Sequence, residues 1–200
     1  MPNRREWLAL TGVGLVAATA GTLLWPRLNP EASAIRMLMA TNFSDLTGNT
    51  RQIADWRDKI LVCNFWATWC APCREEMPLF ARMQIEYVDK SVQFVGIGID
   101  QVSKMREFSN SLQIPYPLLV AGAETLGLMQ KLGNTSGGLP FTVVLDREGR
   151  LAARHLGALQ QPELAALLAR LVDEVAHRRL ENSERALLTW CERVAGEESP

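Results

Sequence analysis

Two cysteines separated by two residues, Cys70 and Cys73, are the part of this sequence best suited to chemistry. They follow a continuous apolar run, Ile60 to Phe65, and they open a stretch, Ala71 to Tyr87, whose pattern predicts a helix. A thiol in the first turn of a helix faces unpaired backbone N–H groups and the positive end of the helix dipole, and both favour the thiolate. A thiolate attacks disulfides, and a second thiol three residues later can resolve the mixed disulfide. The spacing therefore predicts redox chemistry, with Cys70 as the nucleophile, exposed at the helix start, and Cys73 as the resolving thiol.

A C-x-x-C pair can also be half of a zinc site or a purely structural bridge. Zinc needs about four ligands, usually from two such pairs, and the other candidate ligands have no paired spacing: Cys63, Cys191, His155 and His177. A bridge that closes so short a loop removes little chain entropy, so it would stabilise the fold only weakly. The redox interpretation is therefore favoured, and we expect neither a metal nor a bound cofactor.

The two remaining cysteines have different expectations. Cys63 lies inside the predicted strand and is expected to be a small buried hydrophobe. Cys191 lies near the C-terminus, where a free thiol, an intermolecular bridge and a buried filler all stay open.

The residues around the cysteine pair resemble a known family. The run FWATWCAPCREEMP at 65–78 is similar to the TlpA/ResA branch of the thioredoxin-like thiol:disulfide oxidoreductases, which includes the reductases of cytochrome c maturation. The resemblance covers about residues 43–177 and includes FSDLTG at 43–48 and GLPFTVVLD at 138–146. It implies an α/β, thioredoxin-like fold, in which helices flank a central mixed sheet, with the insertion that TlpA-type proteins carry.

The resemblance also implies a role for Glu76. It is the second glutamate of the pattern REEMP at 74–78, and by resemblance it would exchange a proton with Cys73. The two residues are three apart on the predicted helix and so share a face. A partly buried carboxyl group has a raised pKa and can act near neutral pH. The alternative is an exposed helix glutamate, which is what we expect of Glu75.

A second set of residues would bind the substrate. By resemblance, Pro140 is the cis-proline that thioredoxin-like proteins place opposite the disulfide, and Leu139 would expose its backbone to an extended substrate segment. Trp69 and Pro72 would complete this surface, and Pro72 would also stiffen the loop between the cysteines. Trp66 could join the rim of the surface or belong to the core.

The residues between the cysteines bear on the direction of the reaction. A strong oxidant stabilises its thiolate heavily, often with a cation such as histidine between the cysteines, and Ala71-Pro72 supplies none. The reduction potentials of thioredoxin and of the oxidant DsbA differ by about 150 mV, which corresponds to about 7 kcal/mol for the transfer of two electrons. The missing cation favours a reductase. Two alternatives stay open: an oxidant or isomerase with the same cysteines, and a non-catalytic redox switch that gates partner docking through the C-terminal helix.

Composition excludes several classes of protein. The chain has 48% hydrophobic and 22% charged residues, as ordinary globular proteins do, which argues against disorder. A net charge of −1 gives no sign of nucleic-acid binding, and four cysteines are too few for a disulfide scaffold.

We expect three parts: an export signal or membrane anchor with a linker at 1–34, the thioredoxin-like domain at 35–177, and a helical tail at 178–200.

The N-terminal part predicts export. Arg4-Arg5 precede an uncharged stretch, Trp7 to Pro26, whose twenty residues would span about 30 Å as a helix. Basic residues before an apolar stretch favour export of the rest of the chain, and the order of residues resembles a twin-arginine signal. Ala32-Ser33-Ala34 offers a cleavage site, so a cleaved signal and a retained anchor are both open. The segment from Pro26 to Met39 is expected to be a linker.

Export sets the expected partners. The protein would be periplasmic or otherwise extracytoplasmic, and anchored to the inner membrane if the N-terminal helix is retained. The resemblance implies disulfide-containing protein substrates, namely apocytochrome c or copper-site assembly proteins. Because that compartment is kept oxidising, a reductase there needs electrons from a transmembrane thiol donor of the DsbD/CcdA kind.

The remaining patterns predict the elements that position the site. A second central strand is expected at Val92 to Ile99, and helices are expected around Met105 to Leu112 and Glu124 to Leu132. The helix around Met105 to Leu112, together with Leu118 to Val120, resembles the insertion of TlpA-type proteins. Further predictions are a hairpin of 141–146 with 151–156, and a helix that starts at Pro162 with the apolar stripe Leu164, Leu167, Leu168, Leu171 and Val175. Asn182-Ser183 would cap another helix, packed on the domain.

Overall fold

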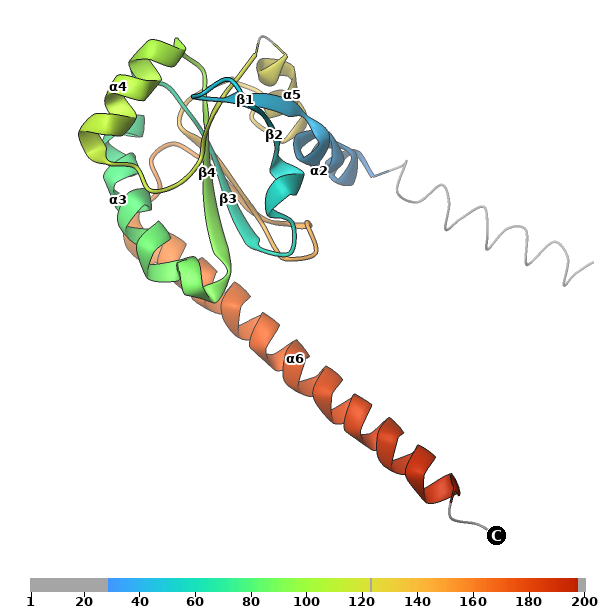
Figure 1. Cartoon of the computed structure of the whole chain (residues 1–200). Coiled ribbons are helices and arrows are strands. Elements are labelled where there is room, and N and C mark those ends of the chain that lie inside the picture. The colour runs from blue at the N-terminus through green and yellow to red at the C-terminus, as the bar shows by residue number, and fades with distance from the viewer. Residues whose placement is uncertain (1–28, 123, 198–200) are drawn as a thin grey trace, which may run out of the picture.

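The computed structural model describes residues 29–122 and 124–197 (Figure 1). Within these residues, seven strands form one mixed sheet in the order β2-β1-β5-β4-β3-β6-β7. Their bounds are β1 Asn42–Asp45, β2 Thr50–Gln52, β3 Ile60–Trp66, β4 Val92–Gly98, β5 Leu118–Val120, β6 Phe141–Leu145 and β7 Leu151–Leu156. The central strand β3 pairs parallel with β4 and antiparallel with β6.

Helices cover both faces of this sheet. Their bounds are α2 Pro30–Ala40, α3 Ala71–Tyr87, α4 Val102–Leu112, α5 Thr125–Lys131 and α6 Gln161–Glu197, with short 3-10 turns η1 Ile53–Trp56 and η2 Val88–Lys90. One buried cluster joins the sheet to α3, α4 and the first turns of α6, and a second joins the opposite face to α2 and α5. The result is the α/β arrangement, a mixed sheet flanked by helices, that the sequence predicts.

The two central strands form the buried middle of the sheet. Every residue of β3 and of β4 is buried, as expected of strands covered on both faces. Gly98 is needed in β4, because a Cβ atom there would lie 2.2 Å from the Met105 side chain of α4. The absence of a side chain lets α4 pack closely on the strand.

Most of the predicted elements are confirmed. Helix α3 has the predicted bounds, with Pro78 inside it, and α4, α5 and the β6–β7 hairpin lie where their patterns placed them. Leu118 to Val120, for which no secondary structure is predicted, form strand β5 between β4 and β1. The apolar stripe of α6 packs as predicted, since Leu164, Leu168 and Leu171 are buried.

The expected linker is wrong over Pro30 to Met39, because this segment is helix α2. The side chain of Asn29 accepts a hydrogen bond from the backbone of Ala32 and caps the helix, and Pro30 occupies its first turn. Ala34, Ile35 and Leu38 are buried against the sheet. The suggested cleavage site at 32–34 therefore lies inside a packed helix of the domain.

The predicted export signal or anchor, at residues 4–26, lies outside the described residues. Across 29–122 and 124–197, no helix combines the length and the apolar character that crossing a membrane requires.

The expected second C-terminal helix is also wrong. Helix α6 runs without a break through Asn182-Ser183, and its second half extends away from the domain instead of packing on it (Figure 1). Three large apolar side chains there are at least 60% exposed: Leu180, Leu187 and Trp190. The surrounding glutamate, arginine, alanine and leucine residues are good helix formers, so one asparagine and one serine do not end the helix. The side chain of Cys191 lies outside the description.

The two halves of α6 predict responses of different size to the same substitution. Leu168 is fully buried and Leu187 is 62% exposed. We expect Leu168→Ala to lower the free energy of unfolding by about 2–5 kcal/mol, because it leaves a cavity in the core. Leu187→Ala should change it by less than about 0.5 kcal/mol. Urea denaturation of the oxidised protein measures both, and a comparable loss in the two variants would contradict this division of the helix.

Candidate active site

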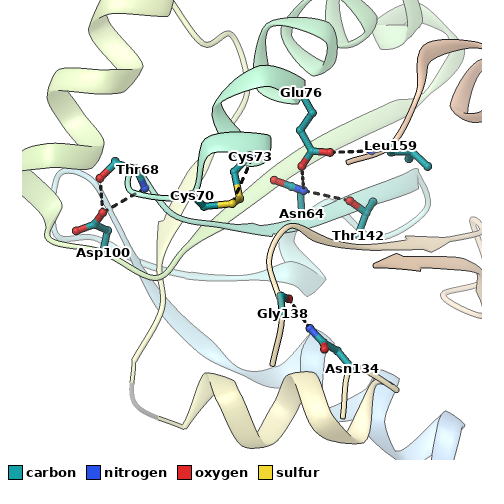
Figure 2. The surroundings of a disulfide bond; sticks show 10 residues. All are labelled: Asn64, Thr68, Cys70, Cys73, Glu76, Asp100, Asn134, Gly138, Thr142 and Leu159. Carbon is teal, nitrogen blue, oxygen red and sulfur yellow. Dashed lines mark hydrogen bonds between the residues drawn. A yellow bond between two sulfur atoms is a disulfide. The ribbon is translucent and has the colours of Figure 1, made fainter. Parts of the chain in front are cut away.

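The two cysteines form a disulfide at the N-terminus of α3. Cys70 is the N-cap residue of the helix, and its sulfur accepts a hydrogen bond from the backbone N–H of Cys73 at 3.3 Å (Figure 2). The chain reaches this position through the short loop 67–69, which leaves the end of β3. The predicted place of Cys70 at the helix start is confirmed, but its predicted exposure is wrong. Cys70 is only 6% exposed and Cys73 is fully buried, whereas the neighbouring Trp69 is 68% exposed.

An aspartate at the end of β4 holds the loop that carries Cys70. The Asp100 carboxylate accepts hydrogen bonds from the backbone N–H of Thr68, at 3.2 Å, and from its hydroxyl group (Figure 2). Burial raises the pKa of Asp100, but the hydrogen bonds from Thr68 and Gln101 outweigh burial and bring the pKa below its ordinary value. Our sequence reasoning missed this residue. Its signal was an acidic side chain directly after a buried strand parallel to β3.

Glu76 is buried beneath the first turns of α3. It is 3% exposed, its Oε1 accepts a hydrogen bond from Asn64 Nδ2 at 2.8 Å, and its Oε2 accepts one from the backbone N–H of Leu159 at 3.0 Å (Figure 2). Burial raises the pKa of Glu76 to about 7, although both hydrogen bonds act in the opposite direction. The structure thus selects the buried carboxyl over the exposed helix glutamate. Glu75, in contrast, is exposed, as expected.

Asn64 joins Glu76 to the sheet. It is 2% exposed on β3, and its Nδ2 also donates to the Thr142 hydroxyl oxygen at 3.1 Å. Asn64 and Thr142 are directly paired across β3 and β6. Its Oδ1 atom is buried and has no hydrogen-bond partner among the described residues. Sequence reasoning noted the asparagine in an apolar run but gave it no role. A lone polar residue in a strand buried on both faces was the available signal.

The loop before β6 carries the second part of the site. The Leu139–Pro140 peptide bond is cis, which confirms the prediction for Pro140. The buried Asn134 fixes this loop, since its Nδ2 donates to the backbone oxygen of Gly138 at 2.8 Å (Figure 2). Leu139 is partly buried and packs against both core clusters.

The residues of the expected substrate surface differ in their exposure to solvent. Trp69 and Pro72 are exposed, Leu139 is partly buried and Pro140 is buried. Their role in binding stays a prediction. Trp66 is fully buried and belongs to the core, so the alternative place at the rim is wrong.

The other cysteine that the structure describes is not suited to exchange. Cys63 lies on β3, is fully buried as predicted, and has its pKa raised to about 12 by burial. Within the described parts of the chain, no group of three or more histidine, cysteine, aspartate or glutamate side chains could hold a metal ion.

Comparisons with known proteins agree with this geometry. The thioredoxin-like protein YneN of Bacillus subtilis is 29% identical over 167 residues, which are 80% of this chain and 95% of YneN. The thiol-disulfide oxidoreductase ResA of Bacillus cereus is 26% identical over 66% of this chain and 76% of its own. A thiol:disulfide interchange protein of the thioredoxin family from Chlorobium tepidum superposes with a TM-score of 0.60 at 24% identity, covering 66% of this chain and 92% of that protein.

A family model places the chain more directly. The model of the AhpC/TSA family matches residues 34–154, which is more than half of the chain and runs from α2 to β7. It includes the disulfide, Glu76 and the cis-proline loop. The fold, the Cys70–Cys73 disulfide and these relatives make the chain a thiol-disulfide oxidoreductase, and it belongs to the AhpC/TSA family.

Proposed function

We propose that this protein is an exported reductase of protein disulfides that works through a mixed disulfide. The observation that carries the proposal is a disulfide at a helix N-terminus with a buried carboxyl group one turn below it, Glu76. Helix N-terminal N–H groups stabilise the thiolate of the reduced pair, and a carboxyl group with a pKa near 7 can exchange protons at neutral pH.

The proposed reaction has two steps. In the reduced protein, the Cys70 thiolate attacks a substrate disulfide, forms a Cys70–substrate bond and releases the first substrate sulfur as a thiolate, which takes a proton from water. Cys73 then gives its proton to the Glu76 carboxylate and attacks the Cys70 sulfur. The Cys70–substrate bond breaks, and the second substrate sulfur leaves as a thiolate and is protonated. Two electrons pass to the substrate, and the Cys70–Cys73 disulfide forms.

The direction of the reaction rests on the loop between the cysteines. Ala71 and Pro72 bring no cation that would stabilise the thiolate strongly, and a weakly stabilised thiolate belongs to a reducing pair. The same cysteines could serve an oxidant or an isomerase. A switch without turnover is the remaining alternative.

The setting of the reaction rests on the N-terminal sequence. Arg4-Arg5 and the uncharged stretch after them favour export, and an extracytoplasmic reductase needs a donor of electrons. We propose a transmembrane thiol donor of the DsbD/CcdA kind as that source. The proposed clients are disulfide-containing proteins, with apocytochrome c and copper-site assembly proteins as the classes that the family resemblance suggests. They would bind along Trp69, Pro72, Leu139 and Pro140, at the end of α3 and the cis-proline loop.

The first experiment tests turnover. We expect Cys70→Ser to lower the rate of insulin reduction with dithiothreitol at least about a hundredfold, because the attacking thiolate is lost. Cys63→Ala is the matched control and should keep the wild-type rate, since this thiol is fully buried. If wild type and Cys70→Ser were equally inactive, the result would contradict turnover and would support the redox-switch alternative.

A second experiment tests direction. The equilibrium of the Cys70–Cys73 pair with glutathione gives its reduction potential. We expect a value near that of thioredoxin, about −270 mV. A value near that of DsbA, about −120 mV, would make the protein an oxidant.

A third experiment tests Glu76 as the base. In a Cys70→Ala background, alkylation of Cys73 by iodoacetamide should accelerate as the pH rises through about 7, because the ionised carboxylate can then accept the thiol proton. Glu76→Gln cannot ionise, so this inflection should disappear and the rate should rise only at the pKa of the thiol itself. An unchanged pH–rate profile would exclude this role for Glu76.

A further inference from the structure

Asn64 has one end of its amide engaged and the other end unpaired. Its nitrogen donates to Glu76 at 2.8 Å and to Thr142 at 3.1 Å, while its Oδ1 atom is buried with no partner among the described residues. Buried polar side-chain atoms are rarely left unpaired. An unpaired acceptor inside a hydrogen-bonded cluster indicates a donor that this oxidation state does not supply.

The disulfide is the place where such a donor would arise. In Figure 2 the Asn64 oxygen points toward the Cys70–Cys73 disulfide, and the nitrogen points toward Glu76 and Thr142. Disulfide sulfurs carry no hydrogen. Reduction gives Cys73 an S–H group, which is a hydrogen-bond donor.

We propose that Asn64 is a positioning residue whose amide holds the two partners of the proton transfer, the Cys73 thiol at its oxygen and the Glu76 carboxylate at its nitrogen. This inference rests on the proposed function, in which Glu76 takes the Cys73 proton. The amide carries no proton itself. It keeps the thiol and the carboxylate side by side while the proton passes from the Cys73 sulfur to the Glu76 carboxylate.

The surrounding structure fixes which way the amide points. Asn64 lies between Val62 and Trp66 in the alternation of β3, and these two residues belong to the core cluster beneath α3. Its side chain therefore faces α3 and cannot turn to solvent. An ionised Glu76 can only accept hydrogen bonds, so the donating nitrogen must face it. With the nitrogen between Glu76 and Thr142, the oxygen is left for the thiol.

Few other titratable groups surround Glu76 among the described residues. Tyr116, from the segment before β5, is buried, and its pKa is raised by burial and also by the charge of Glu76. On the α6 side, His155 and Glu163 lie 3.6 Å apart and line a cavity of about 220 Å³ together with Thr142 and Leu159. These groups are the same in each variant below, so they do not distinguish one variant from another.

Two substitutions remove the hydrogen-bond donor of the amide, and one of them also removes its acceptor. Asn64→Leu removes both the donor and the acceptor, and Asn64→Asp keeps acceptor oxygens but loses the donor. With either, we expect the Glu76 carboxyl transition, followed by carbon-13 NMR of the reduced protein, to move to higher pH. We expect Asn64→Leu to slow Cys73 alkylation at neutral pH about tenfold in the Cys70→Ala background.

Gln84→Leu is the matched control. Gln84 is also a buried amide on α3, but it bonds to the backbone of Phe94 on β4, away from the disulfide. The loss of a buried amide should lower stability in this variant too, while the Glu76 transition and the Cys73 profile stay as in wild type.

The results distinguish this inference from the proposed function. If Glu76→Gln changes the Cys73 profile and Asn64→Leu leaves both readouts as in wild type, the role of Asn64 is overturned while that of Glu76 stands. If Glu76→Gln itself has no effect, the proposed base fails first. Should Asn64→Leu not fold, the infrared S–H stretch of Cys73 decides in a Cys63→Ala, Cys70→Ala, Glu76→Leu, Cys191→Ala protein, in which residue 76 cannot accept a hydrogen bond and Cys73 is the observed thiol. A hydrogen-bonded band supports the inference, and a free S–H band overturns it.

Discussion

The burial of one carboxyl group, that of Glu76, is the constraint on which the rest of the site depends. A carboxylate away from water is costly unless hydrogen bonds replace its solvation. Here the replacements come from distant parts of the chain, an asparagine on β3 and a backbone N–H at Leu159, which lies 83 residues after Glu76. Strand β3, helix α3 and the segment just before α6 must therefore all be in place before the carboxyl group acquires its raised pKa.

Hydrogen bonds from polar side chains also hold the two loops of the site in place. In each loop, a backbone group that lacks a regular backbone partner bonds to a buried or partly buried polar side chain. Asp100 holds the loop before Cys70, and Asn134 holds the loop before the cis-proline. Asp100 lies outside the loop that it holds, just after β4. Asn134 lies in the loop that it holds, four residues before Gly138. The two loops of the site are therefore each held by a polar side chain, Asp100 for one and Asn134 for the other.

The ends of the described chain contrast with this centre. Helix α2 buries three apolar residues and so becomes part of the domain, although its sequence is short and rich in small residues. The second half of α6 keeps helical structure without burying its leucines or its tryptophan. Helix propensity is sufficient to continue a helix that the core has already nucleated, but it does not determine whether the helix packs.

The sequence by itself determined the chemistry of the site and most of its scaffold. The spacing of the cysteines, the apolar runs of β3 and β4, and the period of α3 depend on neighbours along the chain, so local patterns identify them. Resemblance located Glu76 and Pro140 without showing what holds them. Only the tertiary structure decided that Glu76 is buried, that Asn64 and Leu159 bond to it, and that Asp100 anchors the loop. It also decided that α2, at one end of the described residues, packs on the sheet while the second half of α6, at the other end, does not. Those outcomes depend on which surfaces meet across the sheet, and contacts between residues far apart in sequence leave no periodic signal within either segment.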